Sequence, residues 1–173
     1  GMVKNQALLR SVLIRVDYNV PMQNGSILDL NRIEASMPTI QYYLKQKQNI
    51  VLMSHFGRPE GRDSNYSLRK LVPSLEKLLN IKVCFIPDIT ELSAHITREQ
   101  NHPISILENL RFYPGEKTND IEFAKLLSNY GDIYINDAFG VSHRNHASVS
   151  AITQFFKNKK HRGFLLEREL IEL

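Results

Sequence analysis

Four arginines lie in segments that join predicted strands to helices, where a cluster of positive charge would bind an anion. They are Arg32, Arg58, Arg111 and Arg144. A guanidinium group presents several N–H donors in one plane and matches the geometry of phosphate and carboxylate groups. Four such groups around one hollow would repel one another unless an anion bound between them. These side chains therefore predict a site for a small phosphorylated acid.

The segment from His55 to Arg62 follows the apolar run Ile50–Met53, which is typical of a buried strand. In open α/β sheets, ligands bind beyond the carboxyl ends of the strands. Two glycines in the segment, Gly57 among them, let the backbone come close to a ligand, and His55 and Arg58 supply N–H donors. The segment is a candidate anion-binding loop, although an ordinary polar turn between a strand and a helix has a similar composition.

Two further polar residues follow the predicted strand from Val12 to Val16. If the backbone stays extended beyond it, Asp17 and Asn19 project from one face, because side chains alternate along an extended chain. They would then emerge side by side as hydrogen-bonding partners of the arginines. A purely structural alternative is that Asp17 pairs with Arg15 or begins a turn.

Arg32 stands near a predicted helix start, where a positive charge does not complement the helix dipole. Pro38 divides this region, because proline fits best in the first turn of a helix. We therefore expect a separate turn over 31–37 and a helix over 38–47. A cation at Arg32 is most easily explained by an anionic ligand or a carboxylate partner.

Other common kinds of site receive little support from the sequence. Three histidines, His55, His143 and His146, could hold zinc, but no supporting ligand pattern accompanies them, and we predict no metal site. The sequence contains no nucleophile elbow, no phosphate-binding loop of the Gly-x-x-x-x-Gly-Lys type and no dinucleotide fingerprint. A complete nucleotide site is therefore not predicted.

Apolar runs alternate with amphipathic segments along the chain. This alternation predicts a three-layer, Rossmann-like α/β domain with a mainly parallel twisted sheet covered by helices on both faces. Asn24-Gly25 adds a tight hairpin, and Asn119 with Glu122 predicts a capping box. The expected strands are 12–16, 50–53, 82–86, 104–107 and 132–135, and the expected helices are 38–47, 67–80, 90–100 and 120–130.

Composition and charge fit one soluble globular domain of 173 residues. The net charge is +4, and part of it lies in the cluster Lys157–Arg162, which we expect to be a solvated loop because no aromatic side chains alternate with it. Cys84 is the single cysteine and is predicted to be a core thiol in a reducing cytoplasm. No apolar run approaches the ~20 residues that span a bilayer. We therefore expect a cytoplasmic protein without nucleic-acid or membrane partners.

Four segments resemble the phosphoglycerate kinase family, in the order of that family. They are Arg15–Pro21, Ser54–Pro59, Leu107–Glu116, and Asn136–Gly140 with His143–Ser148. The resemblance covers nearly the whole chain but only the amino-terminal half of the family's protein. It implies a substrate-binding domain over 2–162 and the start of an interdomain helix over 163–173, with the carboxyl-terminal nucleotide-binding domain expected to be absent.

The resemblance implies that the domain binds 3-phosphoglycerate or 1,3-bisphosphoglycerate. By that resemblance Asp17 and Asn19 hold the glycerate end, and Arg32 is the catalytic residue beside the transferred phosphoryl group. The segment 55–58 forms the loop, and three arginines form a basic patch around the 3-phosphate. The implied substrate-binding set is Asp17, Asn19, Arg32, His55, Gly57, Arg58, Arg111 and Arg144.

The implied reaction moves a phosphoryl group between 1,3-bisphosphoglycerate and ADP, giving 3-phosphoglycerate and ATP in glycolysis. Its acceptor is a carboxylate, which titrates near ~3.5 and is ionised at neutral pH, so no general base is needed. In the family, magnesium-bound ATP or ADP lies on the carboxyl-terminal domain, and hinge closure joins the halves. We expect this chain alone to bind phosphoglycerate weakly, to bind no nucleotide cofactor and not to turn over.

Some features leave alternatives open. The proline usually found early in the 67–80 helix is replaced near Lys70, and Pro73 appears instead, which affects the entry geometry of that helix and not the site. Whole family members are usually monomers, but exposed apolar residues such as Phe164 and Ile171 lead us to expect self-association here. The competing functions are a non-catalytic phosphate-binding or nucleic-acid-binding module and a structural domain with a fossil site.

Overall fold

The structure is a computed structural model that describes residues 11–91, 102–138, 145–157 and 160–162. Its main feature is a six-stranded sheet in the order β5-β6-β4-β1-β7-β8, in which every strand pairing is parallel. The predicted parallel sheet is confirmed, with β1 at its centre. The strands are β1 (Ser11–Arg15), β4 (Asn49–Met53), β5 (Val83–Ile86), β6 (Ile104–Leu107), β7 (Ile133–Asn136) and β8 (Lys160–Arg162).

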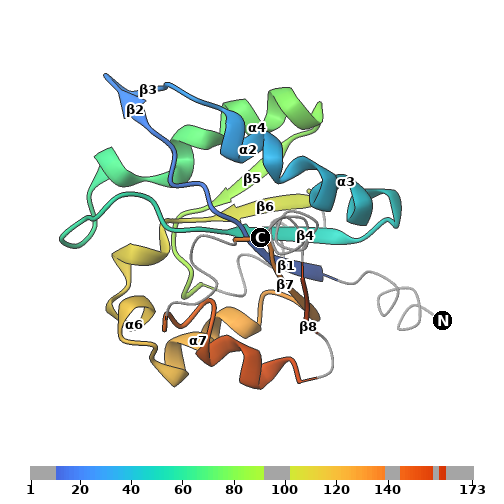
Figure 1. Cartoon of the computed structure of the whole chain (residues 1–173), viewed down its shortest axis with the longest axis vertical. Coiled ribbons are helices and arrows are strands. Elements are labelled where there is room, and N and C mark those ends of the chain that lie inside the picture. The colour runs from blue at the N-terminus through green and yellow to red at the C-terminus, as the bar shows by residue number, and fades with distance from the viewer. Residues whose placement is uncertain (1–10, 92–101, 139–144, 158–159, 163–173) are drawn as a thin grey trace, which may run out of the picture.

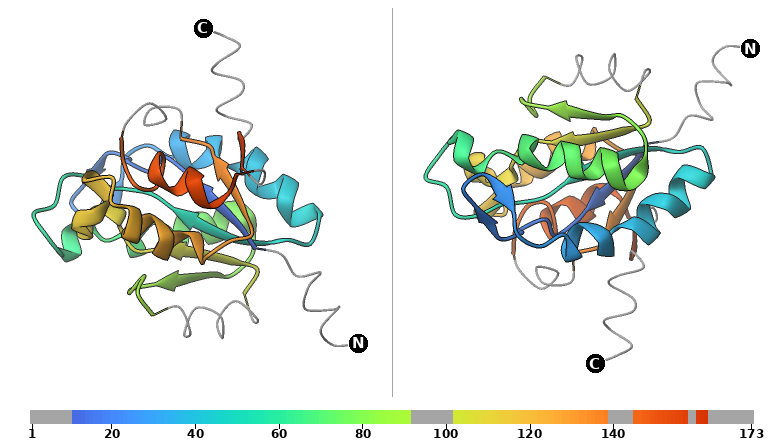
Figure 2. Two further views of the ribbon diagram at one scale, coloured as in Figure 1. Left: turned by 90° about the horizontal axis from the view of Figure 1, so that it is seen from below. Right: turned by 90° about the horizontal axis from the view of Figure 1, so that it is seen from above.

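Helices cover both faces of the sheet (Figures 1 and 2). Side chains alternate along β1, so Val12 and Ile14 enter one apolar core while Leu13 enters the other. The first core lies under α2 (Asn31–Ala35), α3 (Met37–Lys45) and α4 (Val72–Leu79). The second lies under α7 (Ile121–Ser128) and the 3₁₀ helix η5 (Ala151–Phe155). Because both faces are buried there, the central strands are largely apolar runs in the sequence.

Short elements complete the fold. Asn24 and Gly25 have φ of 51° and 80° and join β2 (Met22–Gln23) to β3 (Ser26–Ile27), which confirms the predicted hairpin. Pro38 lies in the first turn of α3, as predicted. The remaining elements are η1 (Ser64–Tyr66), η2 (Leu68–Leu71), η3 (Leu110–Phe112) and α6 (Pro114–Lys117).

The predicted helix over 67–80 is divided in two. The Ser67 hydroxyl accepts the backbone N–H of Arg69 at 3.2 Å and caps η2 rather than a long α-helix. The α-helical part, α4, begins afterwards with Pro73 in its first turn. Proline lacks an N–H and cannot continue a helix from the preceding turn, so it begins a new one. The helix ends before Asn80, whose φ is 53°.

Two sequence predictions about termini and edges were wrong. The capping residue of α7 is Asp120, whose carboxylate accepts the N–H of Phe123 at 2.9 Å. Asn119 instead has a φ of 54° and accepts the N–H of Ala151 at 3.0 Å.

The basic segment Lys157–Arg162 is not all loop, because 160–162 form β8 beside β7. An edge strand needs only one partner and tolerates charged side chains, so its sequence carries little strand signal.

Cys84 is only partly buried, because its strand β5 lies at the other edge of the sheet, so the predicted core thiol was also wrong. Its thiol is free. Most of the expected helix over 90–100 and the terminal apolar residues Phe164 and Ile171 lie outside the described residues. Across the described part of the chain, no helix is both long and apolar enough to cross a bilayer.

Candidate functional site

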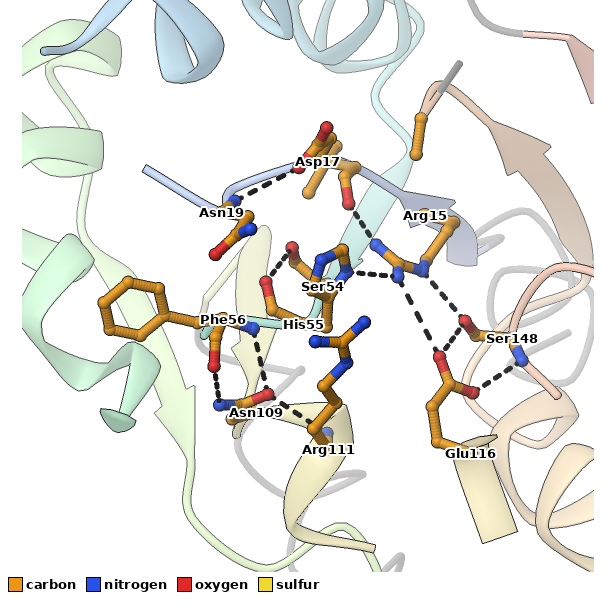
Figure 3. A network of polar contacts seen from close by, with 12 residues as sticks. Arg15, Asp17, Asn19, Ser54, His55, Phe56, Asn109, Arg111, Glu116 and Ser148 are labelled. Atoms are coloured by element: carbon orange, nitrogen blue, oxygen red, sulfur yellow. Dashed lines mark hydrogen bonds and ion pairs between the residues drawn. The ribbon is translucent and has the colours of Figure 1, made fainter. Parts of the chain in front are cut away.

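Three neighbouring strands bring most of the predicted site residues to the end of the sheet where the carboxyl ends of the strands lie (Figure 3). Asp17 and Asn19 follow β1, the segment 55–58 follows β4, and Arg111 lies in η3 just after β6. Since β1, β4 and β6 are adjacent and parallel, their carboxyl ends lie side by side. The fold therefore brings these residues together although more than 90 positions of sequence separate Asp17 from Arg111.

Asp17 pairs with Arg32 rather than with Arg15. The Arg32 Nη1 lies 2.8 Å from the Asp17 Oδ2, and the two side chains are 52% and 17% exposed. The other carboxylate oxygen accepts the backbone N–H of Asn19 at 3.2 Å, so Asp17 also supports a local turn. The carboxylate partner expected for Arg32 is thus Asp17, and about half of the Arg32 side chain remains open to a ligand.

Gly57 connects Asn19 to Arg111. Its N–H donates to the Asn19 Oδ1 at 2.9 Å, and its carbonyl accepts the Arg111 Nη1 at 2.7 Å. Glycine is needed because φ is +63° and an added Cβ would lie 2.4 Å from the Tyr66 Cδ1. Together with the Asp17–Arg32 pair, these contacts form what we call the edge network: Arg32, Asp17, Asn19, Gly57 and Arg111.

The remaining predicted site residues, outside the edge network, differ in exposure and in whether the structure describes them. Arg58 is exposed next to the edge network, with no hydrogen bond or ion pair to another described residue. His55 is buried, with 4% of its surface exposed. Arg144 and His143 lie outside the described residues. Within 11–91 and the later described ranges, no group of three His, Cys, Asp or Glu side chains could hold a metal ion.

Asn109, which is not among the predicted site residues, fixes the loop after β4. Its side chain is fully buried and exchanges two hydrogen bonds with Phe56, from the Phe56 N–H at 3.1 Å and to the Phe56 carbonyl at 2.7 Å. It also donates to the Tyr66 carbonyl at 2.9 Å. A polar residue directly after a buried strand is a signal that could have suggested this role, because buried polar groups need partners.

Ser54 ties the chain after β1 to the end of β4. Its hydroxyl accepts the Tyr18 N–H at 2.9 Å and donates to the His55 carbonyl at 2.9 Å. Its own carbonyl accepts the Leu110 N–H at 3.1 Å, so the three strand ends are held directly to one another. The edge network consequently rests on backbone segments that hydrogen bonds hold to one another.

A buried ionic cluster lies mainly to the right of Asp17, Asn19 and Arg111 in Figure 3. We call it the buried cluster: Arg15, His55, Glu116 and Ser148. The Arg15 Nε donates to the Ser148 Oγ at 2.8 Å, its Nη2 lies 2.8 Å from the His55 Nδ1 and 3.9 Å from the Glu116 Oε2, and both charged side chains are fully buried. Burial lowers the pKa of the Arg15 guanidinium, while the Glu116 carboxylate opposes that shift.

Glu116 is surrounded by donors. Its Oε1 accepts the Ser148 N–H at 2.8 Å, and its Oε2 accepts the Ser148 hydroxyl at 2.5 Å. The Tyr134 hydroxyl donates to the Ser148 carbonyl at 2.7 Å, and burial of Tyr134 raises its pKa. The described site thus combines cations and fixed hydrogen-bonding groups, which suit the binding and orientation of an anion.

Comparison with known proteins identifies the family and the fold of the chain. The family model described as phosphoglycerate kinase matches residues 5–173. The chain belongs to the phosphoglycerate kinase family. The phosphoglycerate kinases of a Wolbachia strain from Drosophila simulans and of a Nitratiruptor species are 47% and 49% identical to it over 163 and 164 residues, which are 93% and 92% of this chain.

A solved phosphoglycerate kinase also shares the fold. The structure from Coxiella burnetii superposes with a TM-score of 0.82 at 35% identity, over 94% of this chain and 41% of that protein. The chain likewise spans 40% and 41% of the lengths of the Wolbachia and Nitratiruptor kinases. The family predicted from the four sequence segments and the α/β fold predicted from the alternation of apolar and amphipathic segments are therefore confirmed. The chain spans less than half the length of these relatives.

Proposed function

We propose that this chain is the phosphoglycerate-binding part of a phosphoglycerate kinase, which moves a phosphoryl group between 1,3-bisphosphoglycerate and ADP. The proposal follows from membership of the family and is carried by one observation. The edge network joins Arg32 to Arg111 through Asp17, Asn19 and Gly57 by hydrogen bonds of 2.7–3.2 Å. Two cations held at the ends of a polar run match a short acid with a charged group at each end.

The intervening residues suit the uncharged middle of such a ligand. A carboxylate has about four acceptor positions, and Asp17 uses two of them on Arg32 and the Asn19 N–H. The others can accept the hydroxyl of a glycerate. Arg32 donates one N–H to Asp17 and is half exposed, so further N–H groups can reach a phosphoryl oxygen. In the proposal Arg32 is the catalytic residue, because it neutralises charge on the phosphoryl group during transfer.

The chemistry requires no general base in this chain. The acceptor carboxylate is ionised at neutral pH, since such groups titrate near ~3.5. We assign magnesium-bound ATP or ADP to the part of the enzyme that lies beyond the matched 40% of its relatives. This chain by itself would therefore bind 3-phosphoglycerate weakly without transferring a phosphoryl group.

Calorimetric titration of the purified chain with 3-phosphoglycerate tests the proposal. The Arg32→Ala variant should bind about 10- to 150-fold more weakly, because a hydrogen bond to a charged group contributes about 1.5–3 kcal/mol. The matched control is Arg69→Ala, which removes an exposed guanidinium lying 4.5 Å from the Phe85 ring centroid on edge strand β5. It should bind as the unmodified chain does.

Two results would contradict the proposal. One is an unmodified chain that shows no saturable binding, and the other is an equal loss of affinity in both arginine variants. A coupled assay adds a separate check on turnover. Phosphoglycerate-dependent consumption of ATP by the chain alone would contradict the assignment of nucleotide binding to the rest of the enzyme.

A further inference from the structure

The buried cluster determines which nitrogen of the His55 ring carries the proton. The Arg15 Nη2 lies 2.8 Å from the His55 Nδ1, within hydrogen-bonding distance. A guanidinium group has five N–H donors and no acceptor. The Nδ1 must therefore be the acceptor, and it accepts only if it carries no hydrogen.

The rest of the cluster holds Arg15 in this orientation. Its Nε donates to the Ser148 Oγ at 2.8 Å, so the hydroxyl hydrogen of Ser148 must point elsewhere. That hydrogen lies toward the Glu116 Oε2, 2.5 Å away, and Glu116 also accepts the Ser148 N–H at 2.8 Å. The Arg15 Nη1 also donates to the Val16 carbonyl, so contacts at Nε and Nη1 hold the guanidinium with its Nη2 against the ring.

We propose that Arg15 is a positioning residue that holds His55 as a neutral imidazole with its proton on Nε2. The Nε2 lies on the side of the ring away from Arg15 (Figure 3). In this form His55 offers a directed N–H donor for which a phosphate oxygen is a suitable acceptor. The ligand part of this inference rests on the proposed function, whereas the protonation state of the ring does not.

The charged form of the ring does not fit the same contacts. An imidazolium carries a hydrogen on both nitrogens, so its Nδ1–H would face the N–H of Arg15 at a nitrogen separation of 2.8 Å. It would also place a second positive charge beside a guanidinium that is fully buried. The positive charge of the site consequently comes from arginines, and His55 contributes direction rather than charge.

Nitrogen-detected NMR of the ¹⁵N-histidine-labelled chain, without ligand at neutral pH, tests the assignment directly. The sequence has six histidines, and the His55 signals are identified by their loss in His55→Gln. The expected pattern has a non-protonated Nδ1 and a protonated Nε2. A proton on Nδ1, or on both nitrogens, would overturn the inference.

The positioning role is tested with Arg15→Lys, which keeps a positive charge but removes the planar donor. The Nδ1-protonated form should become detectable, and 3-phosphoglycerate affinity should fall about 3- to 10-fold. The control, Arg69→Lys, should change neither quantity. A folded Arg15→Lys protein in which the His55 ring nitrogens keep their original protonation would refute the role of Arg15. If that variant does not fold, Ser148→Ala serves in its place, since it removes the acceptor that holds the Arg15 Nε.

The two proposals can fail separately. The ring pattern is measured without ligand, so it stands or falls whether or not phosphoglycerate binds. If the pattern is as expected but 3-phosphoglycerate does not bind, the proposed function is contradicted and the protonation state of His55 is retained.

Discussion

Replacement of Gly57 by alanine should both destabilise the protein and disrupt the edge network. A non-glycine residue in the left-handed region costs about 1–2 kcal/mol, and φ of Gly57 is +63°. The new Cβ would also lie 2.4 Å from the Tyr66 Cδ1, and overpacking of this kind costs about 1–3 kcal/mol. The free energy of unfolding should therefore fall by about 2–5 kcal/mol.

Tyr66 cannot easily relieve this contact. Its ring packs against Phe56 with centroids 6.0 Å apart, and its carbonyl accepts a hydrogen bond from Asn109 at 2.9 Å. The backbone at residue 57 is therefore expected to move instead. Such a shift would displace the N–H that reaches Asn19 and the carbonyl that holds Arg111.

Urea unfolding measures the effect, with Gly25→Ala as the matched control. Gly25 also has a positive φ, +80°, but no atom lies within 4 Å of its added Cβ. With a denaturant slope of about 2 kcal/mol per molar, the midpoint should fall by about 1–2.5 M for Gly57→Ala and by less than about 1 M for Gly25→Ala. Phosphoglycerate affinity should fall only in Gly57→Ala. Equal losses of stability in both variants would refute the idea that the approach to Tyr66 fixes the loop.

Two further predictions concern buried groups. Glu116→Ala leaves the Arg15 guanidinium buried without its carboxylate and should lower the free energy of unfolding by about 3–5 kcal/mol in a denaturant titration, whereas a loss below about 1 kcal/mol would show that the ion pair contributes little. Burial raises the pKa of Tyr18 and Tyr134 above the ordinary value of 10.0, so above that pH the unfolded state loses these protons first and is favoured. The free energy of unfolding should then fall, above about pH 10, by up to about 1.4 kcal/mol per pH unit for each tyrosine. Tyr18→Phe should make the fall in this free energy between about pH 10 and pH 11 less steep. An unchanged slope would contradict the raised pKa of Tyr18.

Much of the fold could be predicted because the strands that form its centre are buried on both faces. Runs such as Val12–Ile14 and Ile50–Met53 have no polar face to obscure them. Strand β8 was missed because an edge strand can be basic and still pair with its one neighbour. The capping residue of α7 was misplaced by one position, because the left-handed backbone of Asn119 depends on its tertiary contact with Ala151.

The candidate site likewise has a part that the sequence predicts and a part that it does not. A positive charge at a helix start predicted an anionic or carboxylate partner for Arg32, but the sequence did not say that this carboxylate is Asp17, for which Arg15 was the structural alternative. The buried cluster could not be predicted, since its hydrogen bond between Arg15 and Ser148 spans 133 positions of sequence. Arginine and glutamate are seldom fully buried, so sequence patterns place both on the surface. Only the packed fold shows that they lie together beside His55.

The most direct test of the account is a titration of the ¹⁵N-labelled chain with 3-phosphoglycerate, followed by amide NMR. The central claim is that the edge network binds this ligand. The largest saturable shifts are predicted at the amides of Asn19, Gly57 and Arg111 and at the side chain of Arg32, with β8 unaffected. Shifts concentrated in the basic strand β8, or no saturable shift in the edge network at millimolar ligand, would contradict the claim.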